Sequence, residues 1–516
     1  RCMNFRETLF YIPVELSFGT SGLRGLIADM TDLECYINTR GFIASLEQHH
    51  NLFKPCKIAL AGDLRDSTPR LLSAVNKGII DSGYTPDWCG FIPTPALTLY
   101  GLRRHIPSIM VTGSHIPADR NGIKFNRADG EIMKTDENNI KACVATIREQ
   151  LYTSAPHEVS FDVNGMSNKL RKLNEANTYA RDEYMERYQS VFSPDMLDGK
   201  HIVVYQHSAV GRDMLVEILA ALGARVTAVQ RSDIFIPIDT ENITPEDRDN
   251  FQSIAKEFPD NFAIVSTDGD SDRPFLIDEL GMFHRGDVLG LVCAQELQSD
   301  TVTIPITASD ALDEVLTNNG VSYTKTKIGS PYVINVMQQA AKTSQRATGW
   351  EVNGGFMTAQ SITYKNGTLE ALPTRDAFLP LLTTLSQATT KKCAVSTLFE
   401  AFPARFTQAG LIDNFSQGIS QKVISLLSEN SKTSKSLLEK IFNKSLGFND
   451  VRAIDTTDGV RLTFNNRDVV HIRPSGNAPQ LRIYATADSQ ARADAIVANG
   501  IKKPIGFLHQ LKSFVC

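Results

Sequence analysis

The stretch Phe262-Ala263-Ile264-Val265-Ser266-Thr267-Asp268-Gly269-Asp270-Ser271-Asp272-Arg273 joins an apolar run to three aspartates at alternate positions. The apolar run, residues 262–265, predicts a buried strand. The aspartates then follow the end of that strand, where a tight turn through Gly269 can bring them to one point. Carboxylates at one point repel one another unless a cation neutralises them, and Mg²⁺ prefers such oxygen ligands. Residues 268–273 are called the metal loop below.

Two other interpretations of this acidic stretch are a solvated turn and an EF-hand loop. An EF-hand loop also begins with alternating acidic residues, but its glycine follows the third of them. Here Gly269 stands second and Pro274 follows Arg273, which disfavours an EF-hand. This stretch alone does not exclude a solvated acidic turn, but the rest of the chain favours a metal site.

A serine and a histidine stand side by side after a second apolar run. Ser114 and His115 follow residues 109–111 and lie in what we call the serine loop, residues 112–117. A serine at a strand-to-loop turn exposes its hydroxyl, and the adjacent histidine can carry a proton. The alternative is a polar turn with a hydrogen-bonded serine. A hydrolase nucleophile elbow is excluded, because residues 112–116 do not read G-x-S-x-G.

Two further loops carry groups suited to a sugar phosphate. The sugar loop, residues 351–355, holds Glu351 and Asn353, whose carboxylate and amide can accept from and donate to paired hydroxyls. The phosphate loop, residues 473–477, combines an arginine, a hydroxyl, an amide and a glycine, which suits an anion such as phosphate. Each loop alone is weak evidence, and their order along the chain carries the argument.

In that order the chain resembles the α-D-phosphohexomutase family, the phosphomannomutases and phosphoglucomutases, over nearly its whole length. The matching segments are residues 18–25, 112–117, 268–273, 351–355 and 473–477. The resemblance implies that Ser114 is a phosphoserine and that its phosphate joins Asp268, Asp270 and Asp272 in binding one Mg²⁺ per chain. The catalytic residues that it implies are Ser114, His115, Arg24, Lys124 and Arg273. The residues that it implies for substrate binding are Lys327, Ser330, Glu351, Asn353, Arg473, Ser475, Gly476 and Asn477.

The reaction implied by the resemblance moves phosphate between C1 and C6 of a hexose. The two oxygens lie on opposite sides of the sugar, so phospho-Ser114 gives its phosphate to the free hydroxyl. The resulting hexose 1,6-bisphosphate, also the expected activator, turns round and returns the other phosphate. Arg24 and Arg273 stabilise the transferred charge, and either Lys124 or His115 moves the hydroxyl proton. Lys124 needs a lowered pKa to act as the base.

The sequence departs from the family in two loops. Many members have alanine at Gly113 and asparagine at Ile116, and the sugar loop commonly has serine at Asn353 and histidine near Gly355. We expect a phosphomannomutase, with phosphoglucomutase as the nearest alternative and phosphoglucosamine mutase as a more distant one. A sugar phosphatase and an inert sugar-phosphate-binding paralogue are alternatives of other classes. The intact serine and aspartates argue against the inert paralogue.

Apolar strands alternate with helical patterns, which predicts an α/β fold. The expected strands are residues 58–61, 108–111, 201–205, 263–265 and 301–304. The resemblance implies three similar α/β domains plus a smaller α+β C-terminal domain around a central cleft. The expected ranges are 1–153 for domain I with the serine loop, 178–285 for domain II with the metal loop, 286–400 for domain III with the sugar loop, and 440–516 for domain IV with the phosphate loop.

The composition is that of an ordinary globular protein. The chain of 516 residues is long enough for three or four domains. Its residues are 42% hydrophobic and 22% charged, which is usual for globular proteins. A net charge of −5 argues against nucleic-acid and membrane partners. The 8 cysteines show no C-x-x-C pairing, and we find no signal peptide or membrane-spanning run. These features predict a cytoplasmic protein, and the resemblance implies a monomer or homodimer whose partner is a hexose phosphate.

Overall fold

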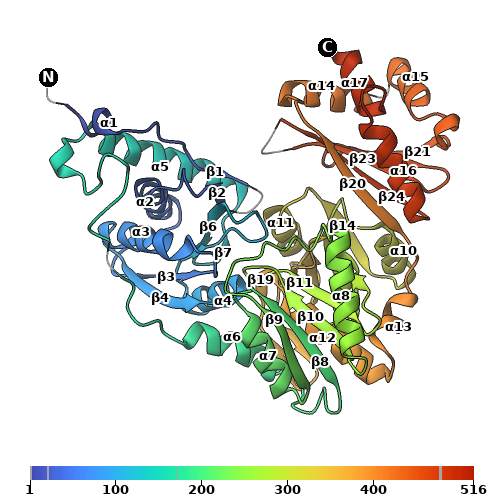
Figure 1. The fold of residues 1–516 in the computed structure, drawn as a ribbon, viewed down its shortest axis with the longest axis horizontal. Helices are drawn as coiled ribbons and strands as arrows, with labels where there is room; N and C mark the ends of the chain where they lie inside the picture. The colour runs from blue at the N-terminus through green and yellow to red at the C-terminus, as the bar shows by residue number, and fades with distance from the viewer. Residues whose placement is uncertain (1–2, 20–21, 171, 430, 476–478) are drawn as a thin grey trace. The chain divides into compact units, whose positions relative to one another are not determined.

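The computed structural model describes residues 3–19, 22–170, 172–429, 431–475 and 479–516. The chain divides into two compact units. Figure 1 colours the chain by residue number, from blue at the N-terminus to red at the C-terminus. The first unit comprises Arg1–Thr303 and Gly329–Phe399, and the second comprises Ile304–Ile328 and Glu400–Cys516. Among the described residues, no helix combines the length and the apolar character needed to cross a membrane.

The first sheet of the first unit is built on a parallel core. Its strands are β1 (Ser17–Phe18), β2 (Leu23–Leu26), β3 (Lys57–Gly62), β4 (Thr85–Phe91), β5 (Ser108–Val111), β6 (Arg120–Arg127) and β7 (Gly130–Glu131). Their order is β1-β2-β6-β5-β3-β4, with β7 paired to β6. β3 pairs in parallel with β4 and β5, whereas β6 runs antiparallel to β5. β3 is continuously apolar because helices cover both faces of the sheet.

Five α-helices belong to this part of the described chain: α1 (Phe5–Thr8), α2 (Asp32–His49), α3 (Thr68–Asp81), α4 (Thr94–Arg104) and α5 (Lys134–Thr153). α2, α3 and α5 lie on one side of the sheet and α4 on the other (Figure 1). Thr31 caps the N-terminus of α2: its Oγ1 accepts a hydrogen bond from the N–H of Glu34 at 3.1 Å. Its buried face packs on the sheet, where Phe42 stacks on Phe125 with ring centroids 4.3 Å apart.

The second sheet of this unit has the order β12-β11-β10-β8-β9. Its strands are β8 (His201–His207), β9 (Arg225–Arg231), β10 (Ala263–Thr267), β11 (Pro274–Asp278) and β12 (Phe283–His284). β8 pairs in parallel with β9 and β10, and β11 runs antiparallel to β10. The helices of this part are α6 (Tyr179–Gln189), α7 (Arg212–Ala221) and α8 (Pro245–Glu257).

The third sheet of the first unit joins β13 (Thr301–Pro305), β15 (Ala347–Trp350), β16 (Phe356–Thr358) and β19 (Leu372–Asp376). The boundary between the two units falls inside β13. β13 and β15 are parallel, and β16 runs antiparallel to β15. The remaining elements are the hairpin β17 (Ile362–Tyr364) and β18 (Gly367–Leu369), and the helices α9 (Gly286–Glu296), α11 (Ser330–Ala340), α12 (Phe378–Lys391) and α13 (Val395–Glu400).

These three sheets repeat one topological feature: a parallel strand is followed by a loop and then by an antiparallel neighbour. The three strand pairs are β5–β6, β10–β11 and β15–β16. The serine loop, the metal loop and the sugar loop are the three connections. Each loop therefore stands beyond the C-terminal end of a parallel strand, the edge at which α/β sheets place their functional side chains. The similarity of the three α/β domains is confirmed at the level of topology.

The second unit contains a different, antiparallel sheet with the order β20-β24-β23-β22-β21. Its strands are β20 (Phe406–Ile412), β21 (Val451–Asp455), β22 (Val460–Phe464), β23 (Val469–Pro474) and β24 (Leu481–Ala487). β22 and β24 alternate buried and half-buried residues, as expected when helices cover one face. The helices of this unit are α10 (Asp310–Asn318), α14 (Gln417–Ser428), α15 (Lys432–Ile441), α16 (Gln490–Ile501) and α17 (Phe507–Val515), and the strand β14 (Ser322–Thr326) follows α10.

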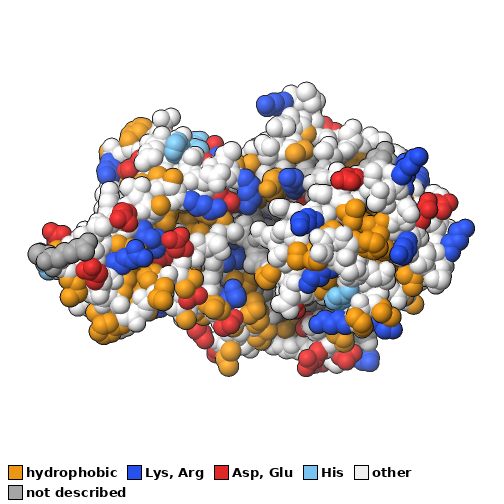
Figure 2. All heavy atoms as spheres, turned by 90° about the horizontal axis from the view of Figure 1, so that it is seen from above, with side chains coloured by type: hydrophobic (Ala, Val, Ile, Leu, Met, Phe, Trp, Pro, Cys, Tyr) orange, Lys and Arg blue, Asp and Glu red, His pale blue; other side chains and the backbone are white. Residues whose placement is uncertain are grey.

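On the face shown in Figure 2, basic, acidic and hydrophobic side chains are interspersed. This distribution agrees with the small net charge of −5.

Candidate active site

The serine loop holds Ser114 in a left-handed backbone conformation, with φ of +53°. This conformation costs a residue other than glycine about 1 kcal/mol or more, so the surroundings must enforce it. The N–H of Ser114 donates to Oγ1 of Thr112 at 2.8 Å, and that hydroxyl donates to Oδ2 of Asp63 at 2.7 Å. The loop is therefore fastened to the end of β3, where Asp63 is buried.

Arg65 fastens the same loop from its other side. Its buried guanidinium donates to four backbone carbonyls at 2.6 to 2.9 Å, those of Ser114, Ile116, Pro117 and Arg120. A Cβ at Gly113 would lie 2.5 Å from Cζ of Arg65. The glycine found here in place of the family's alanine thus leaves room for this arginine.

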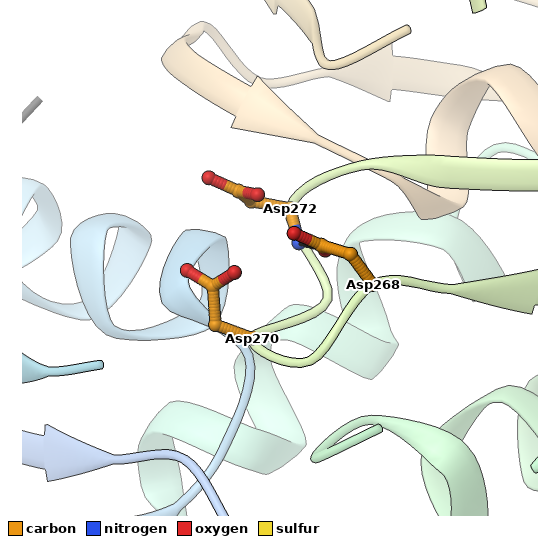
Figure 3. Close-up of side chains that lie close together, drawn as sticks. All are labelled: Asp268, Asp270 and Asp272. Carbon is orange, nitrogen blue, oxygen red and sulfur yellow. Dashed lines mark hydrogen bonds between the residues drawn. The ribbon is translucent and has the colours of Figure 1, made fainter. Parts of the chain in front are cut away.

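The metal loop brings Asp268, Asp270 and Asp272 together from a single turn, and Figure 3 shows their carboxylates facing the same space. One oxygen atom from each lies within 4.8 Å of the other two, and all three residues are buried. Oδ1 of Asp268 accepts from the N–H groups of Asp272 at 3.2 Å and Arg273 at 3.1 Å. Like Ser114, Ser271 at the centre of the turn has a positive φ, +57°.

The three aspartates fit a small hard cation. Oδ1 of Asp270 and Oδ1 of Asp272 are buried and have no hydrogen-bond partner among the described residues. Leaving a buried carboxylate oxygen without a partner costs free energy that a bound cation recovers. Burial and the adjacent charges of Asp270 and Asp272 raise the pKa of Asp268 well above its usual value. Hard oxygen donors in this arrangement suit Mg²⁺.

The serine and metal loops meet, although their central residues lie 154 positions apart. Oγ of Ser114 donates to Oδ2 of Asp268 at 3.1 Å and lies 3.4 Å from Nδ1 of His115. Burial, together with Arg273 and Arg24, lowers the pKa of His115 well below its usual value. The imidazole is therefore neutral near pH 7: it can accept a proton, but as a weaker base than an ordinary histidine.

Lys124 on β6 is held between two carboxylates. Its Nζ lies 2.6 Å from Oδ2 of Asp270 and 3.0 Å from Oδ2 of Asp272. Burial disfavours the ammonium form, but the two aspartates outweigh burial and raise the pKa of Lys124. In this arrangement Lys124 is a counter-ion, whereas a role as general base requires the opposite shift.

Two further arginines gather positive charge beside the aspartates. Nε of Arg273 lies 3.8 Å from Oδ2 of Asp268 and 3.9 Å from Oδ1 of Asp272. Burial, followed by the charges of Arg273 and Arg375, lowers the pKa of Arg24 to about 10. These guanidinium groups lie close enough for their positive charges to repel one another. An anion bound between them, such as a phosphate, would relieve that repulsion.

The sugar loop places Glu351 and Asn353 in buried positions. Oδ1 of Asn353 accepts from the N–H of Gly355 at 2.9 Å, so this side chain caps the turn through Gly354, whose φ is +87°. Ser330, at the start of α11, is also buried, and its hydroxyl donates to Oε1 of Glu131 at 2.9 Å.

The remaining expected residues belong to the second unit. Both Nε and one terminal nitrogen of Arg473 lie 3.4 Å from the carboxylate of Asp458. Ser475 is buried. Gly476 and Asn477 lie outside the described residues, and Lys327 precedes the boundary between the units.

Three residues at the site were missed by the sequence argument: Thr94, Glu131 and Arg375. Oγ1 of Thr94 donates to Oδ2 of Asp270 at 2.6 Å, from the first turn of α4. Arg375 bridges the metal and sugar loops, with partners 103 and 24 positions away in the sequence. Thr94 stands between Pro93 and Pro95, and nothing in this short segment indicates a contact with the metal loop.

A serine buried against convergent carboxylates, in a repeat of α/β domains, is typical of a metal-assisted phosphoryl-transfer enzyme. Family models for phosphoglucomutase/phosphomannomutase match the chain in three places: α/β/α domain I at residues 15–151, α/β/α domain III at 285–406 and the C-terminal domain at 425–502. The chain belongs to the phosphoglucomutase/phosphomannomutase family, and it is an intramolecular phosphotransferase, that is, an isomerase.

Similar proteins include two phosphomannomutases. One from Salmonella muenchen is 39% identical over 497 residues, covering 95% of this chain and 96% of its own. One from Sinorhizobium fredii (strain NBRC 101917 / NGR234) is 37% identical over 485 residues, covering 94% and 98%. The open form of pp63/parafusin, a phosphoglucomutase from Paramecium, shares the fold with a TM-score of 0.67 at 18% identity, covering 98% of this chain and 97% of its own.

Proposed function

We propose that this chain is a phosphomannomutase that interconverts mannose 1-phosphate and mannose 6-phosphate through phospho-Ser114. The observation that carries the proposal is the 3.1 Å contact of the Ser114 hydroxyl with Asp268 inside the aspartate cluster. The choice of mannose rests on the two phosphomannomutases that are 39% and 37% identical over nearly the whole chain.

In the proposed mechanism, Asp268, Asp270 and Asp272 would hold one Mg²⁺, which would withdraw charge from the transferred phosphate. Ser114 carries that phosphate and gives it to the free sugar hydroxyl. The hydroxyl proton goes to the neutral imidazole of His115 and from there to Oγ of Ser114, 3.4 Å from Nδ1, as the bond from that oxygen to phosphorus breaks. Arg24 and Arg273 bind the equatorial oxygens as their charge develops. Lys124 neutralises part of the negative charge of the aspartates. The mannose 1,6-bisphosphate then turns round, and transfer of its other phosphate to Ser114 restores the phosphoserine.

Substrate binding is assigned to the remaining loops. Glu351 and Asn353 would contact sugar hydroxyls, and Lys327 and Ser330 are also assigned to substrate binding. The non-reacting phosphate would be bound by the phosphate loop, namely Arg473, Ser475, Gly476 and Asn477. We further propose the domain ranges 1–153, 178–285, 286–400 and 440–516, each of which carries one of the four loops.

The proposal is tested by assaying the purified chain with Mg²⁺ on mannose, glucose and glucosamine 1-phosphates. We expect the highest kcat/KM for mannose 1-phosphate, with glucose 1-phosphate next, because these epimers differ only at C2 and few hydrogen bonds separate them. A clear preference for glucosamine 1-phosphate would contradict the substrate assignment while leaving the mutase class intact.

Replacing Asn353 with serine is expected to change the ratio of kcat/KM between mannose and glucose phosphates. A serine hydroxyl can still accept from the N–H of Gly355, so the turn survives while the amide donor is lost. Asn443→Ser is a matched control, since Asn443 caps the N–H of Leu446 in the second unit. If the ratio of kcat/KM stays unchanged and only Tm falls, Asn353 merely caps the turn, and the sugar specificity would be assigned to Lys327 and Ser330 instead.

Replacing Arg473 with alanine is expected to raise KM for every hexose phosphate by about tenfold or more, the usual effect of losing a charge-assisted hydrogen bond. All the substrates carry the same anion, so their relative kcat/KM values should hardly change. Arg452→Ala, an exposed arginine on β21, serves as the control. A KM that rises for one sugar only would contradict a role in phosphate binding.

A further inference from the structure

Three consecutive residues of β19 tie it to three other parts of the first unit. Oγ1 of Thr374 donates to Oε2 of Glu131 on β7 at 3.0 Å. Oδ1 of Asp376 accepts from the hydroxyl of Tyr184 on α6 at 2.6 Å. Arg375 stands between them and reaches the metal loop. Because both neighbours of Arg375 are anchored in this way, its backbone is fixed before it meets any ligand.

The guanidinium of Arg375 bridges two loops. Nε donates to Oδ2 of Asp272 at 2.9 Å, and a terminal nitrogen donates to Oε2 of Glu351 at 2.8 Å. The side chains of Arg375, Asp272 and Glu351 are only 5%, 1% and 7% exposed. The rigid fork of an arginine can serve two carboxylates at once, whereas the single ammonium of a lysine cannot reproduce this geometry.

The bridge also selects which oxygen of Asp272 is left open. Arg375 and Lys124 both donate to Oδ2 of Asp272, at 2.9 and 3.0 Å. Oδ1 of Asp272 therefore keeps no hydrogen-bond partner among the described residues, like Oδ1 of Asp270. Asp270 follows the same pattern, since its Oδ2 accepts from Thr94 and Lys124.

The sugar loop is shaped around this arginine. A Cβ at Gly355 would lie 2.5 Å from Cγ of Arg375, so any side chain there would displace it. The N–H of Gly355 is meanwhile bound by Asn353 at 2.9 Å. Because Gly355 has no side chain, Arg375 has room to reach Glu351. The turn holds the backbone of Gly355 in place.

We propose that Arg375 is a positioning residue that fixes Asp272 and Glu351 relative to each other and so couples the metal loop to the sugar loop. This inference rests on the proposed function. By binding Oδ2 of Asp272 it presents Oδ1 to the cation, and by binding Oε2 of Glu351 it presents the other oxygen to a sugar hydroxyl. Disturbing the bridge at either end should therefore be felt at both loops.

The test is a calorimetric titration of the full chain with Mg²⁺, alongside KM and kcat for mannose 1-phosphate. Arg375→Met and Arg375→Lys are expected to weaken Mg²⁺ binding by about 10- to 100-fold, as for other residues that orient metal ligands, and to raise KM. Arg148→Lys is the matched control: Arg148 also forks onto a buried carboxylate, that of Glu34 at 2.6 and 2.7 Å. We expect it to lower Tm only.

A second variant tests the coupling from the other end and does not depend on Arg375→Met folding. Glu351→Gln leaves the three aspartates and Arg375 in place, so a local role for Glu351 would spare the metal. The coupling predicts weaker Mg²⁺ binding here as well. Wild-type Mg²⁺ affinity in Glu351→Gln and both Arg375 variants would overturn the inference. The titration needs no turnover, so its outcome is separate from whether the chain is a mannose mutase.

Discussion

Replacing Ser114 with alanine is expected to reduce kcat by about 10³-fold or more, because the residue that carries the phosphate between the two sugar oxygens is lost. The fold should survive, because the loop is fastened by Thr112 and Arg65 through bonds that do not use the Ser114 side chain. Steady-state assays with mannose 1-phosphate, together with Tm, measure the two effects.

Ser108→Ala is the matched control for this variant. Ser108 lies on β5, the strand that leads into the serine loop, and its buried hydroxyl accepts from Nδ2 of Asn126 at 3.0 Å. Its loss should lower stability by about 1 kcal/mol and leave kcat nearly unchanged. Near-normal turnover by Ser114→Ala would remove the serine from the mechanism.

Replacing Asp270 with asparagine is expected to lower kcat/KM by at least about 100-fold, the upper end of the effect seen for residues that only orient metal ligands. The change removes one of three charges that would bind Mg²⁺ and leaves Thr94 with an acceptor. Removal of Mg²⁺ with a chelator should abolish activity in the wild type, and added Mg²⁺ should restore it.

Asp278→Asn tests whether this effect is specific to the metal loop. Asp278 ends β11, and its buried carboxylate accepts from the N–H groups of Leu280 and Met282 and pairs with His284. We expect a lower Tm with unchanged Mg²⁺ dependence. Full activity of the wild type in chelator-treated buffer would contradict the assignment of the metal loop.

Buried parallel strands were predictable because both of their faces are covered, which produces short continuous apolar runs. The expected strand at residues 108–111 is β5 (Ser108–Val111), and the one at 263–265 lies within β10 (Ala263–Thr267). The aspartates and the serine follow these strands directly, so their places at strand ends followed from the same pattern.

Contacts between loops were not predictable, because spacing within a segment says nothing about which distant segment it meets. Arg375 lies in a strand whose residues give no sign of the metal loop, yet it binds Asp272. Ser330 is proposed to bind substrate, and the bond from its hydroxyl to Glu131, 199 positions away, could not be predicted from the sequence. The topological repeat of the three sheets could not be detected in the residues themselves, because the three sheets are similar in strand pairing and not in residue identity.

The measurement that tests the proposed relay most directly follows the phosphate itself. Mannose 1-phosphate labelled with ³²P is mixed with the Mg²⁺-loaded chain, and label is followed in the protein, the sugar and inorganic phosphate. We expect label on the peptide that contains Ser114 and in mannose 6-phosphate, with almost none in inorganic phosphate. Label that passes to inorganic phosphate without appearing on Ser114 would rule out the phosphoserine relay and identify a phosphatase.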